Sequence, residues 1–249
     1  MPSVMIAGCG DVGSEWPGAC WLKAVKVYGL RRDTAALPRR RGAGGGRSVC
    51  SRATGRRPAQ LDYMVYLPGG GQRARRPLSA PVRRGAAHAL SWLGERKRPL
   101  RHLLQVSSSG VYAQQAGEWV TENSPALADS GSASALLAAE DVALRSGHPA
   151  SVVRLTGIYG PGRNRLIEQA RAGMNVPAEP PQYTNRIHRD DAAGLLAHLL
   201  LQVEAARAAG PLLPGCGRRA GPLARGGRLA AAAARCQPPA RGPDQHPRG

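Results

Sequence analysis

The chain has 249 residues, which is enough for one large α/β domain or for one domain with a small appendage. Its hydrophobic fraction of 42% can supply a core of ordinary size, although aromatic residues make up only 4% and phenylalanine is absent. The formal net charge of +19 would attract polyanions, so nucleic-acid binding competes with a solvated basic surface as an explanation of the charge.

Apolar strands and helical segments alternate along the chain. The first run, Val4–Ala7, is short, apolar and followed by glycine, as expected of a buried parallel strand. Asp190 is predicted to cap the last helix. This alternation predicts parallel βαβ units, and therefore an α/β fold with a Rossmann-type, doubly wound parallel sheet. Further strands are predicted at 25–30, 61–67, 103–106 and 151–155, and helices at 86–94, 133–146, 163–173 and 190–207.

Three stretches interrupt this pattern, at residues 38–60, 68–85 and 208–249. They are rich in arginine and glycine and show neither the period of a strand nor that of a helix. Composition alone predicts loops for the first two and a disordered tail for the third.

The cysteines and the N-terminal residues indicate in which cellular compartment the protein is expected. None of the five cysteines forms a Cys-x-x-Cys pair, so neither a disulfide framework nor a metal site is indicated. The first residues have no basic segment before the apolar run and do not resemble a signal peptide. No stretch is long and apolar enough to span a membrane. We therefore expect a cytoplasmic protein without a membrane partner; the oligomeric state is open.

A glycine-rich hexapeptide follows the first strand. Gly8–Gly13 reads Gly-Cys-Gly-Asp-Val-Gly, the G-x-G-x-x-G pattern of dinucleotide-binding turns. In that pattern Gly8 allows the tight turn, Gly10 lets a pyrophosphate approach the backbone, and Gly13 lets the next helix pack closely. The predicted cofactor-binding residues here are Gly8, Gly10, Asp11, Val12 and Gly13. A βα turn without a ligand is the alternative.

The end of the second strand bears on the choice of cofactor. An acidic residue there would bind the ribose 2′-hydroxyl of NAD, whereas this chain has Arg31 and Arg32. A guanidinium pairs well with the 2′-phosphate of NADP, so Arg31 and Arg32 are predicted to favour NADP(H). Asp33 follows directly and leaves NAD as the alternative.

Four stretches together resemble the extended short-chain dehydrogenase/reductase superfamily, the NAD(P)-dependent epimerase/dehydratase group. Their order and spacing match that family across roughly residues 1–205, where about half of the residues are family-like. The resemblance is nearest to bacterial nucleoside-diphosphate-sugar epimerase-like proteins, and so implies a nucleotide sugar or a similar small molecule as substrate. The four stretches are Gly8–Gly13, Val106–Tyr112, Arg154–Gly162 and Asn185–Ala193.

The resemblance also implies roles for single residues. Ser108 matches the catalytic Ser/Thr position, which orients the substrate oxygen; the alternative is a serine that only caps the next helix. Tyr159 and Gly160 would line the substrate side, unless they form a plain turn. His188 is more often a structural hydrogen-bonding residue. The implied domains are a dinucleotide-binding domain at 1–165 and a partial substrate-covering region at 166–207.

The chain departs from the family at its catalytic pair. The family uses Tyr-x-x-x-Lys, in which the tyrosine transfers a proton and the lysine, one helical turn later, lowers its pKa. Alignment on Ala139 and Glu140 places Gly131 at the tyrosine position and Ala135 at the lysine position. Losing a general acid commonly costs ~10²–10⁴-fold in rate, whereas cofactor binding uses a separate site.

Three functions therefore compete. The first is an NADP-dependent oxidoreductase or epimerase-like enzyme, and the second is a non-catalytic NADP(H)-binding sensor or scaffold. The third is an arginine-driven nucleic-acid binder, which is weaker because the sequence lacks a helix-turn-helix, zinc or RNA-stacking pattern.

Only three of the 35 basic residues are lysines (Lys23, Lys26 and Lys97). This excess of arginine motivates the hypothesis that the arginine-rich stretches are out-of-frame translations of GC-rich DNA. Resequencing the gene tests that hypothesis.

Overall fold

The fold is that of a computed structural model of the chain. The residues that it describes are 2–15, 25–30, 49–51, 60–68, 79–93, 99–114, 116–127, 129–174, 183–205, 210–216 and 220–222.

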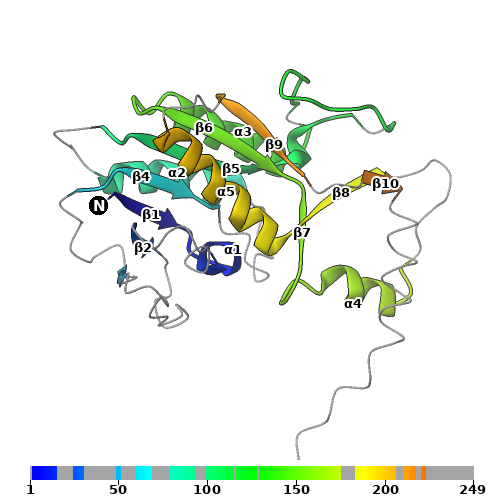
Figure 1. Cartoon of the computed structure of the whole chain (residues 1–249). Helices are drawn as coiled ribbons and strands as arrows, with labels where there is room; N and C mark the ends of the chain where they lie inside the picture. Colours follow the sequence, from blue (N-terminus) through cyan, green and yellow to red (C-terminus); the bar gives the residue numbers. More distant parts are fainter. Residues whose placement is uncertain are drawn as a thin grey trace, which may run out of the picture.

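Within these residues, seven strands form one parallel sheet in the order β3-β2-β1-β4-β5-β6-β9 (Figure 1). All residues of β1 and β4 are buried, because a parallel sheet covered on both faces needs apolar side chains on both. The strand order reverses between β1 and β4, which makes this a doubly wound, Rossmann-type sheet as predicted. The strands are β1 (Ser3–Ala7), β2 (Lys26–Leu30), β3 (Val49–Ser51), β4 (Tyr63–Tyr66), β5 (His102–Ser108), β6 (Ala150–Leu155) and β9 (Leu212–Gly215).

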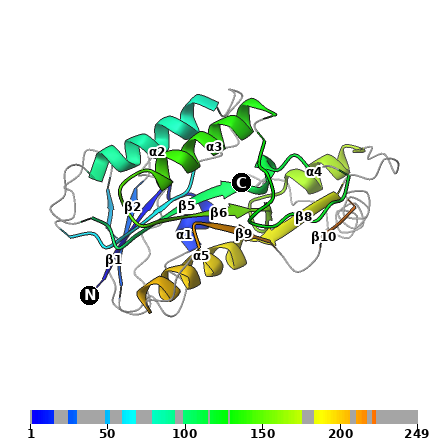
Figure 2. The same ribbon diagram turned by 90° about the horizontal axis from the view of Figure 1, so that it is seen from above.

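Helices cover both faces of the sheet (Figure 2). On one face, α2 (Ser79–Leu93) and α3 (Gly131–Leu144) pack alanines against Met5 and other strand residues. On the other face, α1 (Asp11–Glu15) and α5 (Arg189–Glu204) pack against Ile6 and its neighbours. Met5 and Ile6 point to opposite faces because successive strand side chains alternate. The small alanines let the helices lie close to the sheet, which gives a dense core without phenylalanine.

A second, smaller sheet continues directly from the carboxyl end of β6. It has the order β10-β8-β7, with β7 (Gly157–Tyr159) parallel to β8 (Tyr183–His188) and β8 antiparallel to β10 (Ala220–Pro222). Helix α4 (Arg165–Arg171) lies at the same end of the molecule (Figure 1). Of the region 166–207, α4 and β8 lie in this second unit, whereas α5 returns to the core of the main sheet.

The prediction that the arginine-rich stretches lack regular structure is wrong in four places. β3 lies in the first stretch, α2 begins in the second at Ser79, and β9 and β10 lie in the third. β9 shows no alternation, but it adds to the open edge of β6, and its Leu213 packs against the core. The strand structure of β9 therefore depends on pairing with β6 and on burial of Leu213, and not on an alternating apolar pattern in its own sequence.

The predicted cap of α5 is also wrong. His188, not Asp190, is the N-cap residue: its backbone is extended, and its Nδ1 accepts a hydrogen bond from the Asp190 amide at 3.3 Å. Asp190 already lies inside the first turn, where its carboxylate still meets the positive end of the helix dipole. The structural role expected of His188 is the one that it has here.

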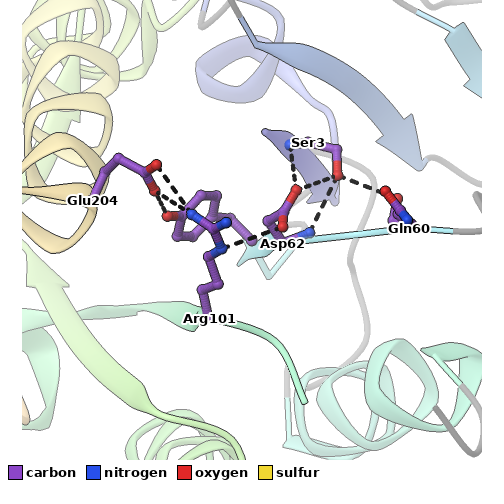
Figure 3. A network of polar contacts seen from close by, with 6 residues as sticks. Ser3, Gln60, Asp62, Arg101 and Glu204 are labelled. Carbon is purple, nitrogen blue, oxygen red and sulfur yellow. Dashed lines mark hydrogen bonds and ion pairs between the residues drawn. The ribbon is translucent and has the colours of Figure 1, made fainter. Parts of the chain in front are cut away.

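A polar network ties together the amino ends of β1, β4, β5 and the end of α5 (Figure 3). Asp62 accepts hydrogen bonds from the Ser3 amide at 2.8 Å and from the Ser3 hydroxyl at 2.9 Å. Arg101 lies between Asp62, at 3.4 Å, and Glu204, at 3.1 Å, and Tyr63 also donates to Glu204. Because this edge is opposite the carboxyl end of β1, the network holds the sheet together away from the glycine turn.

Candidate functional site

The glycine hexapeptide links β1 to α1 at the carboxyl edge of the sheet, where doubly wound folds bind their ligands. Gly8 has φ +90°, and a Cβ there would lie 1.9 Å from the carbonyl oxygen of Leu67. A Cβ on Gly13 would lie 3.0 Å from Cγ2 of Ile6. The amide of Gly8 donates to the carbonyl of Leu30 at 2.9 Å, which ties the turn to the end of β2. The positive φ and the clash with a backbone oxygen therefore require glycine at position 8, whereas a side chain at position 13 would press against the side chains of Ile6 and Leu67.

Gly10 differs from the other two glycines of the motif. The nearest atom to a Cβ built on Gly10 is the Gly8 carbonyl oxygen, 3.8 Å away, which is ordinary contact. Among the described residues, neither packing nor a positive φ explains this glycine, so the space beside it suits a group that approaches the backbone from outside. Val12 is only 4% exposed and belongs to the core, so only its backbone is placed to meet a ligand.

Asp11, the fourth residue of the hexapeptide, is paired with a residue far along the chain. Arg163 donates from NH2 to Asp11 Oδ1 at 2.9 Å and from Nε to Oδ2. Burial raises the pKa of Asp11, but the Arg163 guanidinium and the Val12 amide more than offset this, so the pKa lies below its ordinary value. Asp11 is therefore a carboxylate at neutral pH, held in a bidentate ion pair.

Ser108 is the last residue of β5. Its Oγ accepts a hydrogen bond from the Gly110 amide at 3.2 Å and so caps the 3₁₀ helix η3 (Ser109–Val111). This is the capping role given above as the alternative to a catalytic role for Ser108. Because the oxygen only accepts in this bond, the hydroxyl hydrogen can still be donated to another partner. The side chain is partly exposed at the carboxyl edge of the sheet, as a substrate-orienting group needs to be.

A buried polar cluster lies beneath Ser108 and was not predicted. Ser107 donates to Glu140 Oε1 at 2.5 Å, and Arg154 donates to the two Glu140 oxygens at 3.1 and 2.7 Å. The Arg154 guanidinium also lies 4.9 Å from the ring centre of Tyr112. Burial lowers the pKa of Arg154, but Glu140 and Tyr112 raise it by more than burial lowers it. The pKa therefore lies above its ordinary value, and Arg154 stays charged. A glutamate in the alanine-rich helix α3 and a lone arginine in the apolar strand β6 were the available signals.

Tyr159 and Gly160 lie where the second sheet approaches the first. The Tyr159 side chain is 48% exposed, and its ring meets His188 edge-on with centres 5.2 Å apart. Gly160 has φ +133°, and a Cβ there would lie 2.9 Å from Nε2 of His188. Glycine is therefore required at 160 by the contact with His188, and Tyr159 stays available to a ligand.

The positions aligned with the catalytic tyrosine and lysine carry no proton-transfer group. Gly131 is the exposed first residue of α3, and nothing lies within 4 Å of a Cβ built on it. Ala135 is 5% exposed and belongs to the apolar core between α3 and the sheet.

Arg31 and Arg32, the predicted 2′-phosphate contacts, and the competing Asp33 lie outside the described residues. β2, however, ends at Leu30, whose carbonyl accepts hydrogen bonds from the amides of Gly8 and Cys9. Among the described residues, no three His, Cys, Asp or Glu side chains gather where they could hold a metal ion, and no helix is long and apolar enough to cross a membrane.

Comparisons with known proteins agree with this geometry. No protein-family model matches the sequence, and no curated protein matches it. A solved structure from Methylobacillus flagellatus, described as an NAD-dependent epimerase/dehydratase, is 32% identical, with a TM-score of 0.74 over 97% of this chain and 85% of that one.

More distant solved structures share the fold. An NAD-dependent NDP-hexosamine 5,6-dehydratase of tunicamycin biosynthesis is 18% identical, with a TM-score of 0.71 over 94% of this chain and 82% of that one. UDP-glucuronic acid 4-epimerase from Bacillus cereus, solved with UDP-glucuronic acid and NAD, is 16% identical, with a TM-score of 0.64 over 90% of this chain and 80% of that one. Taken with the first relative, whose identity is high enough to decide the family, these findings show that the chain belongs to the NAD-dependent epimerase/dehydratase family of extended short-chain dehydrogenases/reductases.

Proposed function

We propose that this chain binds a nicotinamide dinucleotide at Gly8–Gly13, beside a substrate surface that includes Ser108, Tyr159 and Gly160. The observation that carries the proposal is Gly10, a glycine that neither packing nor backbone strain requires. A side chain at this position would stand between the backbone amides and an approaching pyrophosphate. Gly8, with its positive φ, and Gly13 shape the turn that leaves this space beside Gly10.

NADP(H) is the cofactor that we favour, with NAD as the alternative. The hydrogen bonds from Gly8 and Cys9 to Leu30 put the end of β2 beside the turn, so the residues that follow start next to the adenosine side of the site. These residues are Arg31 and Arg32, whose guanidinium groups suit a 2′-phosphate. The solved relatives named above are NAD-dependent, which keeps NAD as the comparison ligand in any titration.

The substrate that we propose is a nucleotide sugar or a similar small hydroxyl or carbonyl compound, since related structures act on such molecules. A bound nicotinamide would supply a hydride acceptor or donor. Ser108, at the carboxyl end of β5, would orient the substrate oxygen through its hydroxyl hydrogen. The second sheet and α4 would cover the substrate from the side of Tyr159.

A second candidate is a non-catalytic NADP(H)-binding protein, and one observation favours it. Gly131 and Ala135 cannot transfer a proton, and Ala135 faces an apolar core instead of the site. Without the general acid the rate is expected to fall ~10²–10⁴-fold, while binding at the glycine turn is unaffected. Slow turnover or none, with measurable binding, is therefore the expected behaviour.

Fluorescence titration with NADPH and NADH tests the binding proposal. Gly10→Ala should leave the fold intact and weaken binding by about tenfold or more, because only the approach of the ligand is obstructed. Gly194→Ala is the matched control: a Cβ there meets none of the described residues within 4 Å, and Gly194 lies on α5, not in the turn. Equal affinity of wild type and Gly10→Ala, or no binding by wild type, overturns the proposal.

Chromatography of UDP- and dTDP-sugars incubated with the protein and a nicotinamide dinucleotide then separates the two candidates, because an epimerase or dehydratase returns the nicotinamide to its starting state and its turnover shows only in the sugar product. Turnover by wild type that is lost in Ser108→Ala supports the enzyme. Binding without turnover selects the non-catalytic protein.

A further inference from the structure

Asp11 places a negative charge beside the proposed phosphate-binding surface. It follows Gly10 directly, so a carboxylate stands beside the surface where the proposed cofactor would bring its two phosphates. Like charges at close range repel strongly where water is partly excluded. An acid at this position therefore needs a compensating cation if an anionic ligand is to bind.

Arg163, which is distant in sequence but in contact with Asp11, provides that cation. It is 152 residues away in sequence and follows the turn that leaves β7. Its two hydrogen bonds reach both carboxylate oxygens of Asp11, so the pair has no net charge.

The turn that carries Arg163 is braced on its other side. The Arg163 amide donates to the Gly160 carbonyl at 3.0 Å, and Gly160 packs against the ring of His188. Arg189 donates from NH1 to the Pro161 carbonyl at 3.3 Å. The beginning of α5 therefore fixes the turn, and the Arg163 side chain is presented to Asp11 from a defined backbone.

Stability alone does not account for this ion pair. The side chains of Arg163 and Asp11 are 36% and 42% exposed, and ion pairs at that exposure contribute little to folding. Two of the five guanidinium donors bond Asp11, so the group has the capacity to meet a phosphate oxygen as well.

We propose that Arg163 is a positioning residue for the dinucleotide, which cancels the charge of Asp11 beside the phosphates and joins the glycine turn to the turn of Tyr159 and Gly160. The proposal rests on the proposed function. It adds a cofactor-binding residue from the second half of the chain, and it makes Asp11 a residue that opposes binding unless it is paired.

A double-mutant cycle tests this with NADPH and NADH as fluorescent probes. Arg163→Gln should weaken binding by about tenfold or more, because it exposes the Asp11 charge. Asp11→Asn should bind more tightly than wild type, because the Arg163 guanidinium then faces the phosphates without a competing carboxylate. The double variant should recover most of the loss and bind at least about fivefold more tightly than Arg163→Gln, and Arg163→Lys should stay within about threefold of wild type.

Arg145→Gln is the control for the large positive charge of the chain. It removes the same charge from an exposed ion pair with Asp141, on α3 away from the turn, and should leave both affinities unchanged. Wild-type affinity in Arg163→Gln, or a double variant that binds as weakly as Arg163→Gln, overturns the inference while leaving dinucleotide binding in place. A wild type that binds neither probe overturns the proposed function, and the inference with it.

Discussion

Arg154 and Glu140 form a bidentate ion pair, and both side chains are only 6% exposed. The pair joins β6 to α3 directly beneath the end of β5. Two charges that have left water are stable here only because each compensates the other, and because Ser107 and Tyr112 also contact them.

Removing one partner of this pair should therefore be costly. Arg154→Met leaves the Glu140 carboxylate buried without its counter-charge, and we expect the free energy of unfolding to fall by about 3–5 kcal/mol. The double variant Arg154→Met/Glu140→Leu should lose clearly less. Denaturation in urea measures both. The exposed pair of Arg145 and Asp141 is the control, since Arg145→Met should cost at most ~0.5 kcal/mol; equal losses at the two sites would contradict the prediction.

Gly8→Ala separates steric clash from backbone strain. Gly8 and Gly147 both have positive φ, at +90° and +76°, so alanine is strained at either position by ~1–2 kcal/mol. Only at Gly8 would the new Cβ also lie 1.9 Å from a backbone oxygen, because none of the described residues lies within 4 Å of a Cβ at Gly147. We expect Gly8→Ala to lower the unfolding free energy by at least ~2 kcal/mol more than Gly147→Ala. Similar losses in a urea titration would show that the turn relaxes without cost.

His102 should make stability depend on pH. It is 7% exposed, and burial lowers its pKa below the ordinary 6.5. Ser151 donates its only hydrogen to the Gly210 carbonyl at 2.7 Å, so Nε2 of His102 donates to Ser151, and the lowered pKa keeps the ring neutral at pH 7. Between the lowered pKa and 6.5 the unfolded chain binds more protons than the folded one, and stability therefore rises with pH in this window.

His102→Gln keeps a donor for Ser151 but cannot titrate. As pH falls from 7 towards 5, wild type should lose stability relative to His102→Gln with a slope of at most ~1.4 kcal/mol per pH unit. Above about pH 7.5, where the histidine is deprotonated in both states, the two stability curves should run parallel. Urea denaturation at several pH values measures the difference, and parallel curves throughout would show that His102 does not titrate between the two states.

The parts of this molecule that could be predicted from sequence are those specified locally. β1 is a continuous apolar run, and the glycines after it lie next to each other in sequence, so the strand and the turn are visible together. Tyr159 and Gly160 were predicted from a family motif for the same reason. The position of His188 as the cap of α5 was missed because the capping bond depends on an extended backbone one residue before the helix, which composition does not reveal.

The rest depends on contacts that only the topology creates. Asp11 follows β1 of the main sheet, and Arg163 follows β7 of the second sheet, 152 residues later. The sequence around either residue does not predict that the two form an ion pair. β9 and β10 carry no strand period, and each forms because it pairs with a strand placed by other residues, β6 and β8. Arg31 and Arg32, on which the choice between NADP(H) and NAD depends, lie outside the described residues and remain a prediction.

Asp62→Asn should separate stability from ligand binding. Asp62 accepts two hydrogen bonds from Ser3 at the amino end of β1, whereas the glycine turn follows the carboxyl end, about 16 Å further along the strand. The loss of the carboxylate weakens both bonds and the contact with Arg101, so the free energy of unfolding should fall by about 1–2 kcal/mol. The affinity for NADPH should stay within about twofold of wild type, because the network in Figure 3 does not touch the turn. Asp141→Asn, which removes an exposed carboxylate from α3, should change neither quantity by a measurable amount. A variant with reduced NADPH affinity and unchanged stability would mean that the two edges of the sheet are coupled, and that the amino-edge network helps to set the geometry of the glycine turn.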